Sequence, residues 1–293
     1  MFHCLDHVIL AVSDLDAATR QYARLLARSP SWRGEHPSAG TANTLFRLEN
    51  TYIELLSLAG DGPLGRAISA VLDTRGEGLL GMAFGTDDAD SCRATLSERG
   101  LDPEPVEKGL GRDVESGAFR EWLRVPLPLA KTRGVGLFGI QHTSFDEILP
   151  KAPPIGAADA AVFALDHVVV RTADAEACKA LYGDALGLRL ALDREFPQWG
   201  ARLLFFRVGG LTVEVAGSLG DSDDGVDVTR GDRLWGLSWR VRDAVAAHAR
   251  LVEGGFDVDE VREGRKPGTH VFSVRAGTCG VPTLVLEPSP PRD

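Results

Sequence analysis

Cysteine is scarce in this chain, and its placement excludes two kinds of site. The 293 residues include only four cysteines, Cys4, Cys92, Cys178 and Cys279. They lie far apart and form no C-x-x-C pair, so the sequence offers neither a disulfide framework nor a thiolate metal site. This pattern favours reduced thiols, as in a cytosolic protein.

Long apolar runs and basic clusters are also missing. No segment reaches the roughly 18 apolar residues of a membrane span, and the first residues do not read as a secretory signal. The formal net charge is −10, and the basic residues, nearly all arginine, are scattered rather than gathered in a stripe. We therefore expect a soluble, cytoplasmic protein that binds neither a membrane nor nucleic acid.

Two common catalytic motifs are absent as well. The chain has no G-x-S-x-G sequence, the turn that exposes a nucleophilic serine. The glycine-rich fragments 109–111 and 134–136 lack the strand-to-helix context of a phosphate-binding loop. The sequence therefore indicates neither a serine hydrolase nor a nucleotide-binding loop of the common kinds.

What the chain does contain is a repeat. Residues 5–56 and 165–216 align without a gap, at an offset of 160, and share fourteen identities. Both copies begin Leu-Asp-His-Val, and both have a glutamate inside an apolar strand, 47 residues after the histidine. A repeat of this kind predicts a duplicated structural unit.

Each copy predicts the order β-α-β-β-β. In the first, the alternation from Leu5 to Ala11 predicts a strand on which His7 shares the inward face with Ile9. Asp14 is placed to cap a helix that runs through Ala27. The remaining strands are expected at 32–38, 41–49 and 51–56.

A more diverged unit of the same plan follows each copy. Strand and helix signals of this kind recur over 79–141 and 234–287. We therefore predict an α+β fold of four βαβββ modules. The expected domains are residues 1–148 and 163–293, each of two modules, joined by a linker over 149–162 that is rich in proline and alanine.

These modules resemble the vicinal oxygen chelate superfamily, which includes glyoxalases, bleomycin-resistance proteins and extradiol dioxygenases. The resemblance rests on the Leu-Asp-His-Val starts and on the Ile-Glu-Leu and Val-Glu-Val strands. Residues 35–43, Glu-His-Pro-Ser-Ala-Gly-Thr-Ala-Asn, resemble a glyoxalase-like subgroup. The resemblance implies that the modules pair into two half-open barrels, with a divalent metal such as Zn, Ni, Fe, Mn or Mg in the cavity.

The resemblance also implies which positions would hold the metal. The ligand positions on the first strands are His7, Gly81, His167 and Gly236; those on the last strands are Glu54, Gln141, Glu214 and Glu287, with Val285 as the alternative for the last. We expect His7, Glu54 and Gln141 to bind metal in the first half, with His142 adjacent, and His167, Glu214 and Glu287 in the second. The two glycines disfavour the two-His-one-carboxylate triad of extradiol cleavage and predict weaker binding with a preference for harder ions.

The two copies differ in their polar side chains. The first copy has His36, Thr41 and Asn43 where the second has Phe196, Ala201 and Leu203. Thr41 and Asn43 share one face of a strand and could orient a substrate, with Trp122 as a further lining residue. We therefore predict that the first half is the active one, with Glu54 as a catalytic carboxylate and His36 as a general base or an orienting donor.

A structural interpretation of these residues stays open. A histidine at the start of a buried strand is commonly a hydrogen-bonded core residue, and Arg47 or Arg207 could neutralise the buried glutamates. The histidine and glutamate of the second copy could also be inherited from an ancestor and no longer used.

The leading hypothesis is a metal-dependent enzyme, a lyase or isomerase or else a hydrolase, that acts on a small oxygenated metabolite. The alternative is a metal-free small-molecule binding or resistance protein of the same fold. Both predict a small-molecule ligand. The sequence leaves open whether the modules pair within one chain or across a homodimer.

Overall fold

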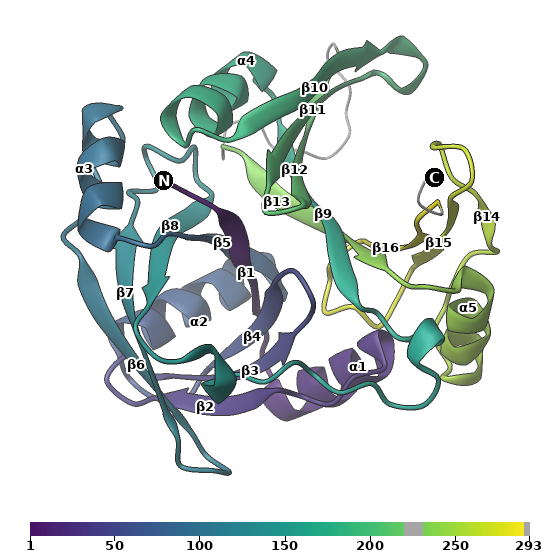
Figure 1. The fold of residues 1–293 in the computed structure, drawn as a ribbon, viewed down its shortest axis with the longest axis horizontal. Coiled ribbons are helices and arrows are strands. Elements are labelled where there is room, and N and C mark those ends of the chain that lie inside the picture. The colour runs from purple at the N-terminus through teal and green to yellow at the C-terminus, as the bar shows by residue number, and fades with distance from the viewer. Residues whose placement is uncertain (220–230, 290–293) are drawn as a thin grey trace.

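A computed structural model of the protein describes residues 1–219 and 231–289. It contains two eight-stranded β-sheets, one from each half of the chain, that lie side by side (Figure 1). No helix among the described residues is long and apolar enough to span a membrane.

The sheet of the first half is a closed barrel with the strand order β1-β4-β3-β2-β6-β7-β8-β5. Its strands are β1 (Cys4–Ala11), β2 (Trp32–His36), β3 (Thr41–Arg47), β4 (Tyr52–Leu58), β5 (Gly78–Gly85), β6 (Glu107–Asp113), β7 (Phe119–Pro126) and β8 (Gly136–His142). The barrel closes because β2 pairs with β6, through Gly34 with Asp113 and Glu35 with Arg112. The half-open barrel predicted for this half was therefore wrong in one respect, since the sheet has no free edge.

The sheet of the second half stays open, with the order β10-β11-β12-β9-β13-β16-β15-β14. Its strands are β9 (Ala164–Thr172), β10 (Arg189–Phe196), β11 (Ala201–Val208), β12 (Leu211–Ser218), β13 (Arg233–Arg240), β14 (Arg262–Glu263), β15 (His270–Val274) and β16 (Thr283–Glu287). The strand that would have to close it, β14, has only two residues. A strand this short offers too few backbone groups to pair with β10.

Four of the helices in the described part of the chain follow strand ends and cover the outer faces of the sheets. They are α1 (Leu15–Leu26), α3 (Ala89–Glu98), α4 (Ala175–Lys179), which continues as the π-helical turn η3 (Ala180–Ala185), and α5 (Ala244–Glu253). Each begins after an aspartate whose side chain accepts a hydrogen bond from a backbone N–H in the first turn: Asp14, Asp88, Asp174 and Asp243. Short 3₁₀ turns lie at η1 (Asp146–Ile148), η2 (Ala158–Ala160) and η4 (Pro197–Trp199).

One helix was not predicted. Helix α2 (Pro63–Arg75) starts with proline in its first turn and packs Ile68 against Ile9 and Leu56, which belong to barrel strands. It also approaches the turn at Gly40, whose φ of +72° and close neighbours leave no room for a side chain. Helix α2 thus fills one end of the barrel with apolar side chains, and polar residues are confined to the rest of the interior.

The two halves are in direct contact. The Tyr22 hydroxyl of α1 donates to the Thr278 carbonyl at 3.2 Å, and Arg250 of α5 donates to the Leu25 carbonyl at 3.0 Å. Asn50 receives a hydrogen bond from the backbone N–H of Leu165 and donates to its carbonyl. Helix α1 is therefore shared between the two cores, and we expect the halves to unfold together.

Candidate functional site

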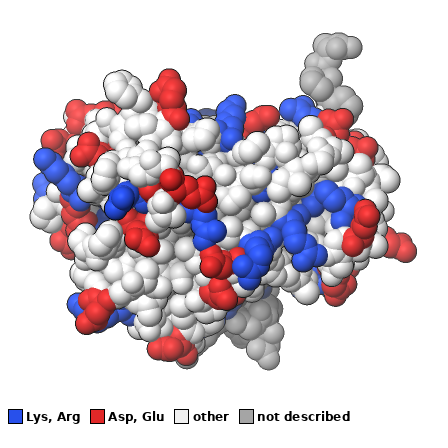
Figure 2. All heavy atoms as spheres, turned by 90° about the horizontal axis from the view of Figure 1, so that it is seen from below, with Lys and Arg blue, Asp and Glu red and all other residues white. Residues whose placement is uncertain are grey.

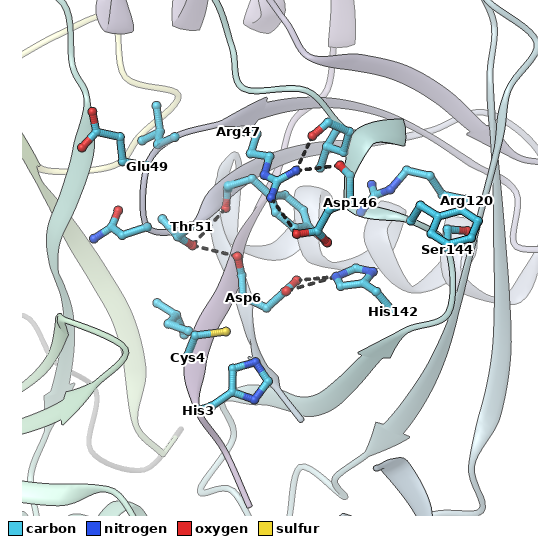
Figure 3. A pocket seen from close by; sticks show the side chains of 16 residues that line it. His3, Cys4, Asp6, Arg47, Glu49, Thr51, Arg120, His142, Ser144 and Asp146 are labelled. Atoms are coloured by element: carbon cyan, nitrogen blue, oxygen red, sulfur yellow. Dashed lines mark hydrogen bonds and ion pairs between the residues drawn. The ribbon is translucent and has the colours of Figure 1, made fainter. Parts of the chain in front are cut away.

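A cavity of about 300 Å³ opens at the mouth of the N-terminal barrel (Figure 3). Its polar lining includes Asp6, Tyr52, Arg120 and His142, which come from β1, β4, β7 and β8. Figure 3 shows His142 and Asp6 pointing toward each other, with Arg120 above them. The volume is at the lower end of the range for small-molecule sites.

Asp6 lies at the centre of this lining because β1 has an irregularity there. The pairing of β1 with β5 shifts register between Leu5 and His7, so Asp6 has no opposite residue. A bulge of this kind re-aims a side chain, and the Asp6 carboxylate turns to the same side as His7. The Thr51 hydroxyl donates to the Asp6 carbonyl at 2.9 Å and holds the bulge in place.

The Asp6 carboxylate bridges two imidazoles. Its oxygens lie 2.7 Å from His7 Nδ1 and 3.0 Å from His142 Nε2. Burial alone would raise the pKa of Asp6, but the hydrogen bonds from His142 and His7 bring it well below its usual range. Because an ionised carboxylate only accepts hydrogen bonds, both rings donate to it, which leaves His7 Nε2 and His142 Nδ1 as the remaining ring nitrogens.

Behind Asp6 a polar chain continues into the barrel. His7 Nε2 lies 3.5 Å from Glu54 Oε2, and Asn43 Nδ2 donates to Glu54 Oε1 at 2.7 Å. His7, Asn43 and Glu54 are all buried. The side-chain oxygen of Asn43, Oδ1, has no hydrogen-bond partner among the described residues. His7 therefore points into the barrel, as predicted, and lies close to Glu54.

Arg120 is the unusual residue of this cavity. Its side chain is only 8% exposed, and no carboxylate of the described residues forms an ion pair with it. The guanidinium carbon lies 5.5 Å from the ring centres of both Trp32 and Tyr52, a distance suited to cation–π attraction. Burial raises the pKa of the Tyr52 hydroxyl well above its usual value, so this group stays protonated. A buried cation without a counter-ion is costly unless an anion binds to it.

The predicted residues His36, Thr41 and Trp122 form a second group in the barrel. His36 Nδ1 lies 3.0 Å from the Thr41 hydroxyl, and the His36 ring stands edge-on to Trp122, with centres 5.9 Å apart. Burial lowers the pKa of His36, so the ring is neutral at pH 7. Glu54 raises this pKa and Arg120 lowers it, which means that His36 shares an electrostatic environment with both.

Two of the predicted metal ligands point elsewhere. Gln141 Oε1 accepts a hydrogen bond at 2.9 Å from the backbone N–H of Ala89, at the start of α3. Glu287 Oε2 accepts one at 2.9 Å from the N–H of Ala244, at the start of α5. Both expectations need correction, because these side chains satisfy helix N-termini outside the sheets rather than facing the cavities.

Strand register identifies the side chains that stand in their place. In the first module Glu54 pairs with Ile9, two residues after His7. In the second module the residue two after Gly81 is Ala83, and its partner is Phe138. The ring of Phe138 lies edge-on to His7, with centres 5.6 Å apart. In the second half, the residue two after Gly236 is Ser238, and its partner on the neighbouring strand is Leu284.

The barrel interior therefore offers two metal-ligating side chains of the expected kind, His7 and Glu54, with Gly81 and Phe138 at the other two positions. The described residues include no group of three or more His, Cys, Asp or Glu side chains that could hold a metal ion. Catalytic zinc sites use three protein ligands and keep one position open. The residues present do not complete such a site, so the predicted ligand set does not fit a resident catalytic metal.

The second half repeats the cluster of Asp, His and Glu but differs in the second partner of the aspartate. His167 Nδ1 lies 2.8 Å from Asp166, and His167 Nε2 lies 3.7 Å from Glu214. The second partner of Asp166 is Arg240, whose Nε donates at 2.6 Å, where Asp6 in the first half has His142. An arginine stays protonated near neutral pH and cannot act as a base. Of the two equivalent clusters, the one in the first half has two imidazoles on its carboxylate, whereas the one in the second half has an imidazole and a guanidinium.

Sequence reasoning missed Arg120 and Tyr52 and did not give Asp6 and His142 a role. Asp6 did carry a signal, since it recurs within both Leu-Asp-His-Val elements, and His142 stands beside the position that was chosen. Arg120 had no such signal in the sequence, because arginines on strands are usually exposed and only the structure shows that this one is buried.

Comparison with known proteins agrees with this fold. A family model described as "Glyoxalase-like domain" matches residues 5–157, and one described as "Glyoxalase/Bleomycin resistance protein/Dioxygenase superfamily" matches residues 166–272. Ethylmalonyl-CoA/methylmalonyl-CoA epimerase of Cereibacter sphaeroides is 32% identical over 97 residues, which are 33% of this chain and 70% of that protein.

Two solved structures share the fold over nearly the whole chain. A mutant of 4-hydroxymandelate synthase from Streptomyces coelicolor has a TM-score of 0.69 at 16% identity and covers 97% of this chain and 92% of its own. A hypothetical protein from Staphylococcus aureus has a TM-score of 0.64 at 12% identity, covering 96% of this chain and 98% of its own. At these identities the likeness shows the fold alone.

Proposed function

Because the chain belongs to the glyoxalase-like family within the glyoxalase, bleomycin-resistance and dioxygenase superfamily, we propose that its N-terminal barrel is the active site of an enzyme. The reaction we propose is proton transfer at a carbon next to a carbonyl group, in a small metabolite that carries a carboxylate. An enzyme with this reaction is an isomerase or a lyase. The relative from Cereibacter sphaeroides is named as an epimerase, and epimerases are isomerases.

The observation that carries the proposal is a buried cation next to a positioned base. Arg120 lines the cavity without a carboxylate partner among the described residues, and His142 lines the same cavity with Nε2 held by Asp6. A substrate carboxylate or carbonyl oxygen would supply the missing anion to the guanidinium, through charge-assisted hydrogen bonds. The substrate would then lie against His142.

Each group has a defined part in the proposed reaction. His142 Nδ1 takes the proton from carbon, and the electron pair moves into the carbonyl to give an enolate. Arg120 stabilises the negative charge that develops on the oxygen. Asp6 holds His142 in the required tautomer and stabilises the imidazolium that forms, while His7, Glu54 and Asn43 fix Asp6 from behind.

The fate of the proton decides the reaction class. Delivery of a proton to the opposite face of the same carbon inverts that centre. If this carbon carries a hydroxyl group, the intermediate is an enediolate, and protonation at the former carbonyl carbon, with the hydroxyl proton moving to the other oxygen, gives an isomer. Loss of a leaving group from the enolate makes the protein a lyase. All three outcomes share the first step, so one measurement detects them together.

That measurement is proton NMR in D₂O with a panel of small 2-oxo and acyl carboxylates. We expect at least one compound to lose its carbon-bound proton faster with the protein than without it. His142→Gln should slow this exchange by about 100-fold or more, the usual contribution of a general base. The neighbouring variant Gln141→Ala should leave it unchanged.

The same assay separates the enzyme from the binding or resistance protein that the sequence also allowed. Saturable binding by calorimetry, without exchange for any compound, would support that alternative and contradict the proposed activity.

A further inference from the structure

The second half of the molecule contains a much larger cavity, with a different character. Its volume is about 1390 Å³, and it occupies the concave side of the open sheet between β11, β12, β9, β13 and β15. This is above the usual range for a site that holds one small metabolite. In a chain of net charge −10, its lining is nevertheless basic.

Four cations in this lining have no carboxylate partner. Arg207, Arg262, Arg265 and Lys266 all line the cavity, all are exposed, and none forms an ion pair within the described part of the chain. The lining acids are already engaged or buried, since Asp166 binds Arg240 and His167, and Glu77 accepts from Ser13. Unpaired charges of one sign in a concave surface concentrate the field and attract ions of the opposite sign.

The repeat shows that this charge is a specific feature of the second half. Arg207 occupies the position of Arg47 in the first copy. Arg47 is paired there with the Asp146 carboxylate at 3.4 Å, and it donates a hydrogen bond to the Asp146 carbonyl at 2.8 Å. The same residue type at the same position in the duplicated fold is therefore paired in one half and unpaired in the other.

The glutamates at the equivalent positions of the two halves, Glu54 and Glu214, also differ in their surroundings. Glu54 receives a hydrogen bond from Asn43, whereas the residue that corresponds to Asn43 in the second copy is Leu203. Burial raises the pKa of Glu214, and the nearby charges of His167 and Arg265 act against this by lowering it.

Aromatic faces stand beside the cations. The guanidinium of Arg265 lies 3.4 Å from the centre of the Trp199 ring, which itself stacks on Phe196 at 4.6 Å. Trp235 lines the same cavity and is 38% exposed. Arg265 follows β14, and Trp199 lies between β10 and β11. Because β10 and β14 are the two edge strands of the open sheet, this contact connects the two edges across the cavity. Figure 2 shows the molecule from below, where Lys and Arg are interspersed with Asp and Glu on a largely uncharged surface.

From these features we propose that the C-terminal cavity binds an organic anion that carries a flat ring and two or more phosphate or carboxylate groups. The unpaired arginines bind the anionic oxygens in bidentate fashion, and the ring packs against Trp235 and against the Arg265 guanidinium that Trp199 supports. This site is separate from the barrel cavity and does not depend on the proposed proton-transfer activity.

Isothermal calorimetry on the full chain tests the proposal with three probes. ADP has a ring and phosphates, benzene-1,3,5-tricarboxylate has a ring and carboxylates, and inorganic pyrophosphate has charge without a ring. At about 50 mM salt, where screening is weak, we expect ADP or the tricarboxylate to bind with a Kd below about 100 μM, and pyrophosphate to bind at least about tenfold more weakly. The tighter of the two ring compounds identifies the anionic group.

The variants separate a built site from general attraction to positive charge. Arg207→Gln with Arg262→Gln should weaken binding by about tenfold or more, which is about 1.4 kcal/mol. Arg66→Gln, which removes an exposed arginine paired with Asp61 in the other half, is the matched control and should change affinity by less than about twofold. Trp199→Leu should weaken the ring compounds more than pyrophosphate.

Two results would overturn the proposal. One is the absence of binding heat for all three probes at about 1 mM, and the other is equal weakening by the Arg66 control and the double variant. All the substituted side chains are exposed, so the variants should fold, and circular dichroism checks this directly.

Discussion

Asp6 Oδ2 lies 3.0 Å from Nε2 of His142, although 136 residues separate the two in the sequence. The contact joins the first strand of the barrel to its last and places a titratable ring in the cavity next to the buried Arg120. In the second half Asp166 binds Arg240 instead. This one exchange, an imidazole for a guanidinium, is our reason for assigning chemistry to the first half.

Asp6→Asn should destabilise the protein in a way that depends on pH. Removing one partner from a buried ionic cluster costs about 3–5 kcal/mol. Because the pKa of Asp6 is lowered in the folded state, its contribution is fully present above the unfolded-state pKa, about 3.9, and is lost as the pH falls below it. Urea unfolding of both proteins from pH 6 to about pH 3 measures the difference. A gap between the two that stays constant below pH 4 would contradict this assignment.

Gln141→Ala should affect stability and leave catalysis alone. Its amide oxygen accepts from the N–H of Ala89, so the loss should resemble that of a helix cap, about 1 kcal/mol in the free energy of unfolding. Chemical denaturation and the D₂O exchange assay together check both statements. Loss of activity with unchanged stability would restore Gln141 as a site residue.

Arg120→Leu should weaken substrate binding, because hydrogen bonds to a charged group contribute about 1.5–3 kcal/mol each. We expect KM to rise by roughly tenfold to 100-fold, and Arg120→Lys to recover only part of this, since an ammonium lacks the planar fork. Arg124→Leu is the control, because Arg124 lies on the same strand and is already paired with Glu107 at 2.6 Å. Equal effects of the two leucine variants would contradict a specific role for Arg120.

Cys4 lines the cavity of the N-terminal barrel but should be a poor nucleophile. Burial raises the pKa of its thiol to about 11, with a further contribution from Asp6. At pH 8 only about one thiol in a thousand is then ionised, so a disulfide reagent should react about 100-fold more slowly than with free cysteine, whose pKa is about 8.5. The rate should rise about tenfold per pH unit up to about pH 11, and a plateau near pH 9 would contradict the raised pKa.

The repeat in the sequence predicted the order of strands and helices in much of this structure, but it did not predict which strands pair or in which register. The alternation around His7, the Asp14 helix cap and the approach of His7 to Glu54 all depend on local periodicity and on one duplicated spacing. Residues 41–47 and 52–58 were predicted as strands within about two residues at each end.

The failures have a common physical cause. The register of β8 against β5 decides whether Gln141 or Phe138 takes the position equivalent to Glu54, and this register is a tertiary property. The bulge at Asp6, the closure of the barrel through β2 and β6, and the burial of Arg120 likewise depend on neighbours distant in sequence. Helix α2 was not predicted, although Leu64, Ile68 and Leu72, spaced four residues apart, pack in one cluster with barrel residues.

The most direct test of the central claim compares the two halves in one assay. Proton-to-deuterium exchange on the active substrate is measured for the wild type, His142→Gln and His167→Gln. The account predicts that His142→Gln loses about 100-fold or more in rate, whereas His167→Gln, which alters the equivalent cluster of the second half, keeps its rate within about threefold. Loss of exchange in His167→Gln with full activity in His142→Gln would place the chemistry in the second half and contradict the account.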